Sequence, residues 1–302
     1  MKAFSYLTTK GEPRIGVQTP EGLLNFTQLW GYFKELKNFP RAPELPFLQL
    51  MVELDYFSEE TFAEVIAAVR EYRSLDDLII REPFSWQLPV QRPTKILCLG
   101  RNYRAHAAEL NNTVPEAPMY FAKVPSSLLP HQGHIRIPAG VGRVDHELEL
   151  ALVIGKRGAN IPESKAMEHV AGYTIANDIT AREMQREEQK KGKPWTLAKG
   201  MDTFCPLGPW LVPAGSVADP HNLTLELKVD GEVRQKGSTA DMVYGIPELI
   251  AYISRYMTLE PGDLLLTGTP EGVGPIQPGN RIEGSIDGLG TLENGVVQAG
   301  SD

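Results

Sequence analysis

The sequence is poor in cysteine. Only Cys98 and Cys205 occur among its 302 residues, and neither belongs to a CxxC pair. Two cysteines are too few for a disulfide framework. We therefore interpret each as a buried structural thiol rather than a nucleophile, and we expect a reducing, cytoplasmic setting.

The sequence also lacks long apolar runs, an excess of basic residues and a nucleotide-binding loop. No segment approaches 18 consecutive apolar residues, and residues 1–13 lack the apolar run of a signal peptide, so we expect no membrane partner. Thirty Lys and Arg residues face 38 Asp and Glu residues, a net charge of -8, which argues against a nucleic-acid partner. The stretch at 264–275 lacks the Gly-Lys-Ser/Thr ending of a P-loop, and no GxGxxG fingerprint occurs.

The pattern of apolar residues, Gly and Pro along the chain changes near residue 90. Short β-like runs and an amphipathic helix at 59–73 form a first unit, and three prolines between residues 81 and 95 predict an irregular linker. From residue 95 onward, short apolar runs alternate with Gly and Pro, which predicts a mostly antiparallel β architecture. We predict helices at 102–110, 180–191 and 246–257. The expected fold class is α+β and β-rich, with a small α+β domain and linker at 1–90 and a larger domain at 91–302.

The stretch HELELALVIG places acidic residues in a strand that should be apolar. Side chains alternate along a strand, so Glu147 and Glu149 share a face with Ala151 and Val153. A third carboxylate, Asp178, ends the strand GYTIAND, and Thr-Ala-Arg-Glu at 180–183 has the form of a capping box. Buried carboxylates lose their charge unless a cation compensates it. The three acids therefore predict a site for a hard ion, Mg²⁺ or Mn²⁺ before Ca²⁺; the alternative is a solvated strand end.

A second polar cluster is GRNYRAHAAELNN at 100–112. His106 and Glu109 lie three residues apart on one helical face, and Asn102 is a possible helix cap. A carboxylate beside an imidazole raises its basicity, as is needed to deprotonate water. The alternative is an exposed pair on a surface helix.

Two further residues are candidate ligand contacts. Lys199 lies among Gly, Pro and aromatic residues, a setting in which a partly desolvated lysine is directed at an anion; the alternative is a surface lysine. Thr269, in a tight turn that lines a pocket, would present its hydroxyl group or its backbone N–H.

Five motifs in this order resemble the fumarylacetoacetate hydrolase family: GRNYRAHAAE, HELELALVIGK, NDITARE, PWTLAKGMDTFCPLGPW and LTGTPEGVG. The likeness covers roughly residues 94–298. It looks closest to the acylpyruvase and oxaloacetate decarboxylase branch, for which KKGKPWTLAK is the cue. Bacterial members with similar motifs are often described as 2-hydroxyhepta-2,4-diene-1,7-dioate isomerases. The resemblance implies a mixed β-sandwich roll, a small extra N-terminal domain and a homodimer.

The resemblance also implies roles for individual residues. Glu147, Glu149 and Asp178 would bind Mg²⁺, and Mn²⁺ is possible. His106 and Glu109 would be a water-activating dyad on a segment that orders when substrate binds.

The remaining implied roles concern the substrate. Arg182 and Gln185 would contact its carboxylate or oxo group, while Lys199 and Thr269 complete the polar lining. Fumarylacetoacetase itself has a further acidic ligand ahead of the dyad histidine. Here the corresponding stretch is Arg-Asn-Tyr at 101–103, which disfavours tyrosine breakdown and favours small 2-oxo acids.

The predicted function is that of a Mg²⁺-dependent enzyme that cleaves a C–C bond next to a 2-oxo acid. Acylpyruvate hydrolysis and oxaloacetate decarboxylation would share a metal-stabilised pyruvate enolate, with Lys199 neutralising oxyanion charge. One alternative is the isomerase or decarboxylase of aromatic-ring catabolism. Another, from a different class, is a dicarboxylate-binding protein without catalysis, which would need the metal but not the base.

Overall fold

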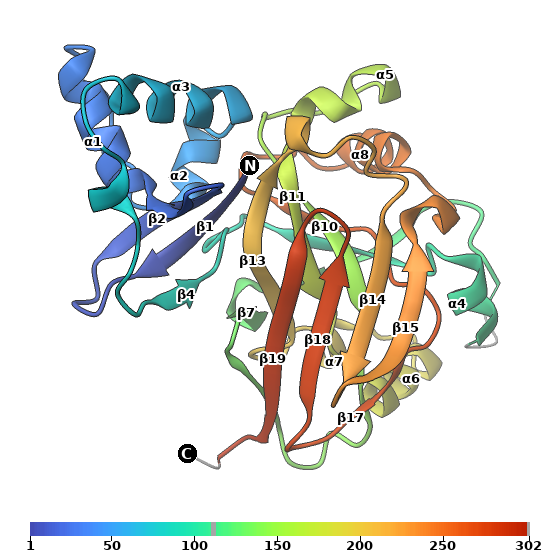
Figure 1. The fold of residues 1–302 in the computed structure, drawn as a ribbon. Coiled ribbons are helices and arrows are strands. Elements are labelled where there is room, and N and C mark those ends of the chain that lie inside the picture. Colours follow the sequence, from blue (N-terminus) through green and yellow to red (C-terminus); the bar gives the residue numbers. More distant parts are fainter. Residues whose placement is uncertain (110–112, 301–302) are drawn as a thin grey trace.

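The computed structural model describes residues 1–109 and 113–300. Its largest sheet has eleven strands (Figure 1). In spatial order, its path comprises β3 (Gly22–Asn25), β2 (Pro13–Thr19), β1 (Lys2–Leu7), β13 (Cys205–Pro213), β11 (Val170–Asn177), β10 (Leu148–Ile154), β16 (Leu264–Leu266), β5 (Ile96–Gly100) and β6 (Met119–Lys123). Two short strands lie off this path: β4 (Ser85–Gln87) pairs with β1, and β7 (Leu128–Pro130) pairs with β13.

Two smaller sheets complete the β structure. A five-stranded sheet has the order β15 (Glu232–Ser238), β14 (Thr224–Val229), β18 (Arg281–Ile286), β19 (Gly290–Gln298) and β8 (His134–Ile137). A three-stranded sheet joins β12 (Thr180–Ala181), β9 (Val144–His146) and β17 (Gly274–Ile276). Most pairings are antiparallel, and the predicted α+β, β-rich fold class is confirmed.

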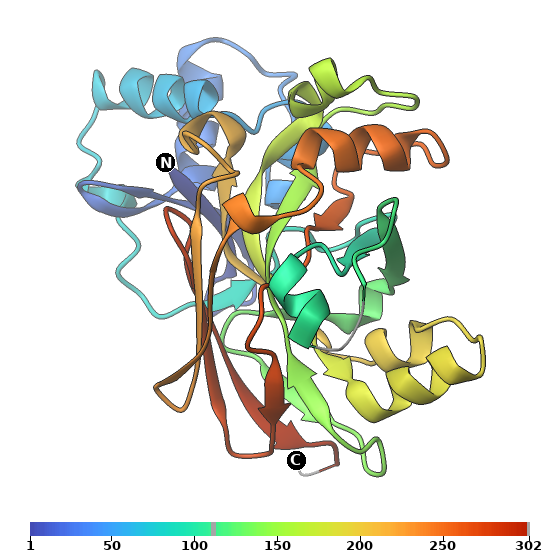
Figure 2. The same ribbon diagram turned by 90° about the vertical axis from the view of Figure 1, so that its right-hand side faces the viewer.

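The helices are short and lie outside the sheets (Figures 1 and 2). They are α1 (Phe26–Leu36), α2 (Leu48–Glu53), α3 (Glu59–Arg70), α4 (Arg104–Glu109), α5 (Glu163–Ala166), α6 (Arg182–Lys190), α7 (Thr196–Lys199) and α8 (Ile246–Ser254). Single 3₁₀ turns occur at Asp76–Leu78, Pro125–Ser127, Met167–His169, Ala214–Ser216 and Thr239–Asp241. Among the described residues, no helix is long and apolar enough to cross a membrane.

Helix α3 shows how the local sequence sets an element. Ser58 caps it, because its hydroxyl accepts a hydrogen bond from the N–H of Thr61 at 3.1 Å. Phe62, Val65, Ile66 and Val69 are buried, and this i, i+3, i+4, i+7 spacing makes one apolar face. The helix predicted at 59–73 is therefore confirmed, with its end three residues earlier.

Strand β10 separates two hydrophobic cores. Leu148, Leu150 and Leu152 face a core shared with the five-stranded sheet and α8. Ala151 and Val153 face a second core, shared with the N-terminal helices and strands. Both cysteines are buried free thiols, as predicted.

Three details of the sequence prediction are wrong. Residues 85–87 of the expected linker form β4, because they pair in register with Ser5–Leu7 of β1. The helix predicted at 180–191 begins only at Arg182, without a side-chain cap. Thr180 instead pairs with Asp145 in the small sheet, and its hydroxyl donates to the Asp178 carbonyl oxygen at 2.9 Å, so the expected capping box does not form.

The other two helices are found at their predicted places but are shorter. Helix α8 ends at Ser254 rather than at residue 257. Helix α4 begins at Arg104 rather than at residue 102, and Leu110 at its predicted end lies outside the described residues.

Candidate active site

The three predicted acidic ligands meet at the break between β9 and β10. Glu147 lies in the break, Glu149 is the second residue of β10, and Asp178 directly follows β11. The N–H of Asp178 donates to the Glu147 carbonyl oxygen at 2.8 Å, which fixes the two chain segments side by side. Each carboxylate offers an oxygen within 4.8 Å of the others, and all three are buried. A solvated strand end, the alternative interpretation, is therefore excluded.

Buried cations already compensate two of these acids. Lys199 Nζ lies 2.8 Å from Glu147 Oε2 and 2.5 Å from Asp178 Oδ2, so Lys199 is not a surface lysine. Lys123 Nζ lies 2.6 Å from Asp178 Oδ1, and the Arg182 guanidinium donates to Glu147. Lys123 was not predicted because it belongs to no motif; its one signal in the sequence is a charged residue within the apolar stretch MYFAKV.

The third acid, Glu149, has no such cation among residues 1–109 and 113–300. Its side chain accepts a hydrogen bond from the backbone N–H of Gly268 at 2.7 Å. Burial, and next the charge of Asp178, raises the pKa of Glu149 well above its ordinary value. Burial acts in the same direction on Glu147, but Lys199 and Arg182 outweigh it and hold the pKa of Glu147 well below its usual range.

The charge of Glu149, which no cation of the described residues compensates, indicates whether the site suits a metal ion. A buried carboxylate without a counter-ion is unfavourable, and it lies beside two further carboxylates that supply only oxygen atoms. Oxygen donors of this kind suit hard divalent cations. The residues therefore fit the divalent ion that the sequence predicted.

The predicted dyad lies on α4. His106 is buried, and its Nδ1 lies 3.5 Å from Glu109 Oε2, which is too long for a good hydrogen bond. Both Glu109 oxygens instead accept from the N–H of Gly272, at 3.1 and 3.3 Å. Burial lowers the pKa of His106 below 6.5, so the imidazole is neutral at pH 7. An exposed surface pair, the alternative, is excluded for His106.

The expectation that Asn102 caps a helix is wrong, because α4 begins two residues later, at Arg104. Its side-chain N–H₂ group donates to the carbonyl oxygens of Thr267 and Tyr244, at 2.8 and 3.2 Å, and its Oδ1 accepts from the N–H of Tyr244 at 2.9 Å. The amide is therefore fully used in joining the end of β5 to two distant loops.

Arg182 and Gln185 are brought to the site by the first turn of α6. The Arg182 Nε donates to Asp145 Oδ2 at 2.8 Å, and its Nη1 donates to Gln185 Oε1 at 2.7 Å. With the bond to Glu147, each guanidinium nitrogen has an internal acceptor. Asp145, fully buried, was not predicted, although it directly precedes His146, the first residue of the stretch HELELALVIG.

The Thr269 hydroxyl is likewise engaged inside the fold. It donates to the Leu148 carbonyl oxygen at 2.8 Å and accepts from Gln235 Nε2 at 2.7 Å. Its backbone N–H, the other group predicted to face a ligand, donates to no described residue and is available.

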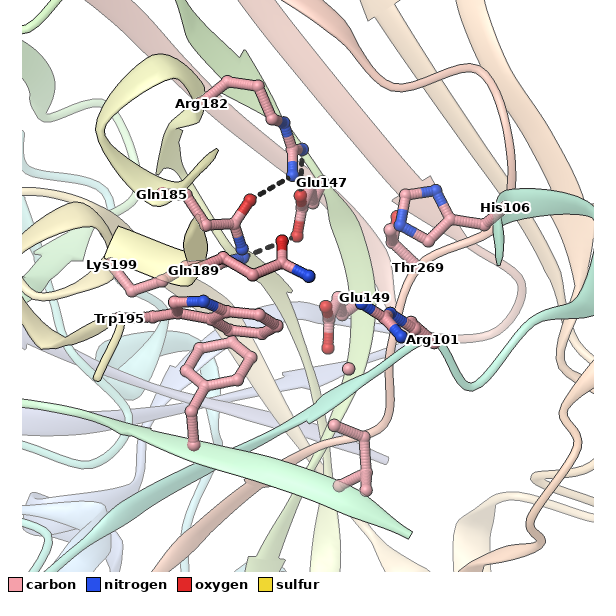
Figure 3. Close-up of a pocket in the computed structure, with 13 residues that line it drawn as sticks. Arg101, His106, Glu147, Glu149, Arg182, Gln185, Gln189, Trp195, Lys199 and Thr269 are labelled. Atoms are coloured by element: carbon pink, nitrogen blue, oxygen red, sulfur yellow. Dashed lines mark hydrogen bonds and ion pairs between the residues drawn. The ribbon is translucent and has the colours of Figure 1, made fainter. Parts of the chain in front are cut away.

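These residues surround one small cavity (Figure 3). Its volume is about 50 Å³, far below the roughly 300–1,000 Å³ of pockets for drug-sized ligands, which favours a small ligand. Seven of the nine predicted site residues line it: His106, Glu147, Glu149, Arg182, Gln185, Lys199 and Thr269. Of the other two, Asp178 forms an ion pair with Lys199, and Glu109 lies 3.5 Å from His106. Lining residues that the sequence did not predict are Leu99, Gly100, Arg101, Phe121, Gln189 and Trp195.

Comparison with known proteins gives consistent matches. A family profile described as fumarylacetoacetate (FAA) hydrolase C-terminal matches residues 95–297. A mitochondrial oxaloacetate tautomerase of Arabidopsis thaliana is 53% identical over 200 residues, which are 66% of this chain and 89% of that protein.

Two solved structures extend the likeness. Fumarylpyruvate hydrolase from Pseudomonas aeruginosa, in complex with Mn²⁺ and pyruvate, is 39% identical, with a TM-score of 0.66 over 70% of this chain and 91% of that one. The 2-hydroxyhepta-2,4-diene-1,7-dioate isomerase from Mycobacterium marinum is 29% identical, with a TM-score of 0.71 over 100% of both chains. The names of all three relatives describe enzymes.

Proposed function

The chain belongs to the fumarylacetoacetate hydrolase family of enzymes, and we propose that it is a divalent-metal-dependent enzyme that forms the enolate of a small 2-oxo acid. One observation carries the proposal: Glu149 is buried without a counter-ion from any described residue, beside two further carboxylates, in a cavity that His106 also lines. This arrangement combines a cation site with a neutral base. A dicarboxylate-binding protein without catalysis, the alternative, would need the cation site but not the base.

Glu147, Glu149 and Asp178 are the residues that would hold the ion. Their donor atoms suit Mg²⁺, our first choice, and Mn²⁺, and the related fumarylpyruvate hydrolase was solved with Mn²⁺. A bound divalent ion supplies Lewis-acid stabilisation of negative charge on the keto oxygen of the substrate. Lys199 adds a buried positive charge on the same side, and Gln185 offers its amide N–H₂ to a substrate oxygen.

His106 supplies the base. With oxaloacetate, the neutral imidazole removes a proton from C3 and returns it to either the carbon or the oxygen, which interconverts the keto and enol forms. With an acylpyruvate, it removes a proton from water, which attacks the distal carbonyl group and releases pyruvate as its enolate. Glu109 acts through His106 by stabilising the imidazolium that forms.

The names of the relatives favour small dicarboxylic substrates. Oxaloacetate tautomerase is the name of a relative that is 53% identical, and fumarylpyruvate also carries two carboxylates. We therefore rank three candidate reactions. Interconversion of the keto and enol forms of oxaloacetate comes first, C–C cleavage of an acylpyruvate or decarboxylation second, and isomerisation of a ring-cleavage dienedioate third. A homodimer and a cytoplasmic location remain part of the proposal.

Substitution of His106 by Ala tests the proposed base. We expect loss of at least 100-fold in kcat on oxaloacetate and acetylpyruvate, with Mn²⁺ affinity within threefold of the wild type, because His106 is not a proposed ligand. Activity is measured with added Mg²⁺ or Mn²⁺ and with EDTA. His169→Ala, a partly exposed histidine that does not line the cavity, is the matched control. Unchanged turnover in His106→Ala would remove the base, and full activity in EDTA would remove the metal.

A further inference from the structure

Arg101 is a cavity-lining cation that the proposed chemistry does not use. It follows β5, directly ahead of the segment that carries His106, and Figure 3 shows its side chain among those that surround the cavity. The residue is partly exposed, so its guanidinium group is open to a ligand.

The other cations of the site are bound to carboxylates of the protein itself. Lys199 lies between Glu147 and Asp178, and Arg182 donates to Glu147 and Asp145. Within the part of the chain that the structure describes, Arg101 makes no ion pair or hydrogen bond through its side chain. Of the three cations that line the cavity, Arg101 is therefore the one whose charge remains available.

The backbone holds Arg101 in an unusual conformation. Its φ is +59°, in the left-handed region that is unfavourable for residues other than Gly, Asn and Asp. The neighbouring Asn102 makes three hydrogen bonds to Thr267 and Tyr244, which fixes the chain on one side of the turn. Strained residues that the surrounding structure enforces are common at functional sites.

Charge balance points to the kind of ligand. Four buried carboxylates, those of Asp145, Glu147, Glu149 and Asp178, are accompanied by Arg143, Lys123, Lys199 and Arg182. A divalent ion and Arg101 would make the site positive overall. A substrate with two carboxylates offsets that excess better than a substrate with one.

We propose that Arg101 binds the second carboxylate of a dicarboxylic 2-oxo acid. This is the carboxylate that is not bonded to the keto carbon, and simple 2-oxo acids lack it. A planar guanidinium pairs with a carboxylate through two parallel N–H···O bonds. Arg101 would thus select oxaloacetate over substrates that end in a methyl group. This inference rests on the proposed function and specifies its substrate class.

The test compares oxaloacetate with 2-oxobutyrate, which has a methyl group in place of the second carboxylate. We measure KM and kcat for oxaloacetate, and the inhibition constant of 2-oxobutyrate as a competitor, in the wild type, Arg101→Gln, Arg101→Lys and Arg104→Gln. Arg104 is an exposed cation three residues further along and serves as the charge-matched control.

We expect Arg101→Gln to raise the KM for oxaloacetate about 10- to 100-fold, with kcat and the 2-oxobutyrate inhibition constant within threefold of the wild type. Arg101→Lys should recover part of the loss, because it keeps the charge without the planar fork. Arg104→Gln should behave as the wild type does. In the wild type itself, 2-oxobutyrate should bind at least tenfold more weakly than oxaloacetate.

Three results would overturn the inference. Equal weakening of both compounds would mean that Arg101 binds their shared 2-oxo acid group or supports the fold. No weakening, or tighter Mn²⁺ binding alone, would mean that it merely balances Glu149. Equal affinity of the wild type for both compounds would exclude a second-carboxylate site without any variant. A wild-type protein that is inactive on oxaloacetate would instead count against the proposed function. That result differs from the three above, so the two failures can be told apart.

Discussion

At the scale of single residues, the most informative group is the carboxylate of Glu149. It is 1% exposed, and the raised pKa of Glu149 reflects burial and the neighbouring acids. A carboxyl group with a higher pKa in the folded than in the unfolded protein lowers stability at any pH above its unfolded value. Without a bound ion, the folded protein is thus less stable at neutral pH than it would be with a neutral side chain at this position.

The variant Glu149→Gln separates metal binding from stability. We expect Mn²⁺ affinity to fall at least 100-fold, because one of three anionic ligands is lost. We also expect the metal-free variant to be as stable as the wild type or more stable, because Gln keeps an acceptor for the Gly268 N–H and removes the buried charge. Calorimetric titration with Mn²⁺ and thermal unfolding in EDTA measure the two effects. Exposed Glu187→Gln is the control, and a lower Tm for metal-free Glu149→Gln would contradict this account.

At the scale of elements, Gln235 of β15 connects the acidic strand to the turn beside it. Its Oε1 accepts from the N–H of Leu148 and lies 3.0 Å from His146 Nδ1, while its Nε2 donates to Thr269 Oγ1 and the Pro270 carbonyl oxygen. The five-stranded sheet thereby sets the position of the turn that supplies the Gly268 N–H to Glu149. Gly268 has a φ of +94°, and a Cβ there would lie 2.8 Å from that of Asn102, so the close approach requires glycine.

Substitution of Gln235 by Ala should therefore affect both stability and the metal site. It leaves several buried groups without partners, at a cost of about 3 kcal/mol or more. We expect Mn²⁺ affinity to fall about 10-fold, as is typical when a residue that orients metal ligands is lost. Denaturant unfolding and Mn²⁺ titration measure the two changes, with exposed Lys236→Ala as control. Native affinity in Gln235→Ala would show that the turn keeps its position without this brace.

At the scale of the whole molecule, the N-terminal unit and the rest of the chain share one core. Strand β1 pairs with β13, and Ala151, Val153 and Leu266 of the large sheet pack in the same cluster as Leu48 of α2. We propose that residues 1–90 and 91–302 are two units by sequence that unfold as one. Two independent domains would each have a separate core.

Calorimetry of the metal-free protein checks this proposal. We expect a single unfolding transition. Leu48→Ala should move the whole transition to lower temperature, because deletion of a buried leucine side chain costs about 2–5 kcal/mol. Exposed Leu54→Ala, one residue beyond the same helix, should shift it little. Two resolved transitions, with only the first shifted by Leu48→Ala, would show that the units are independent.

The local pattern of the sequence was sufficient to locate the buried acids and the histidine beside them. Glu147 and Glu149 were identified by strand alternation, Asp178 by its place at a strand end, and His106 and Glu109 by helical spacing. Strand alternation depends on backbone geometry alone, so it does not need the rest of the fold. The predicted capping box failed because tertiary pairing of Thr180 with Asp145 overrode the local preference.

The sequence by itself identified the three acids and the histidine that the folded chain brings to one cavity, whereas the tertiary structure alone decided which charges compensate one another. Lys123 is 55 residues from Asp178, and Gly268 is 119 residues from Glu149. Contacts over such distances leave no periodic signal, because they depend on how strands are ordered in the sheets. For the same reason, only the folded chain distinguishes Arg101, whose charge is available, from Arg182 and Lys199, whose charges are not.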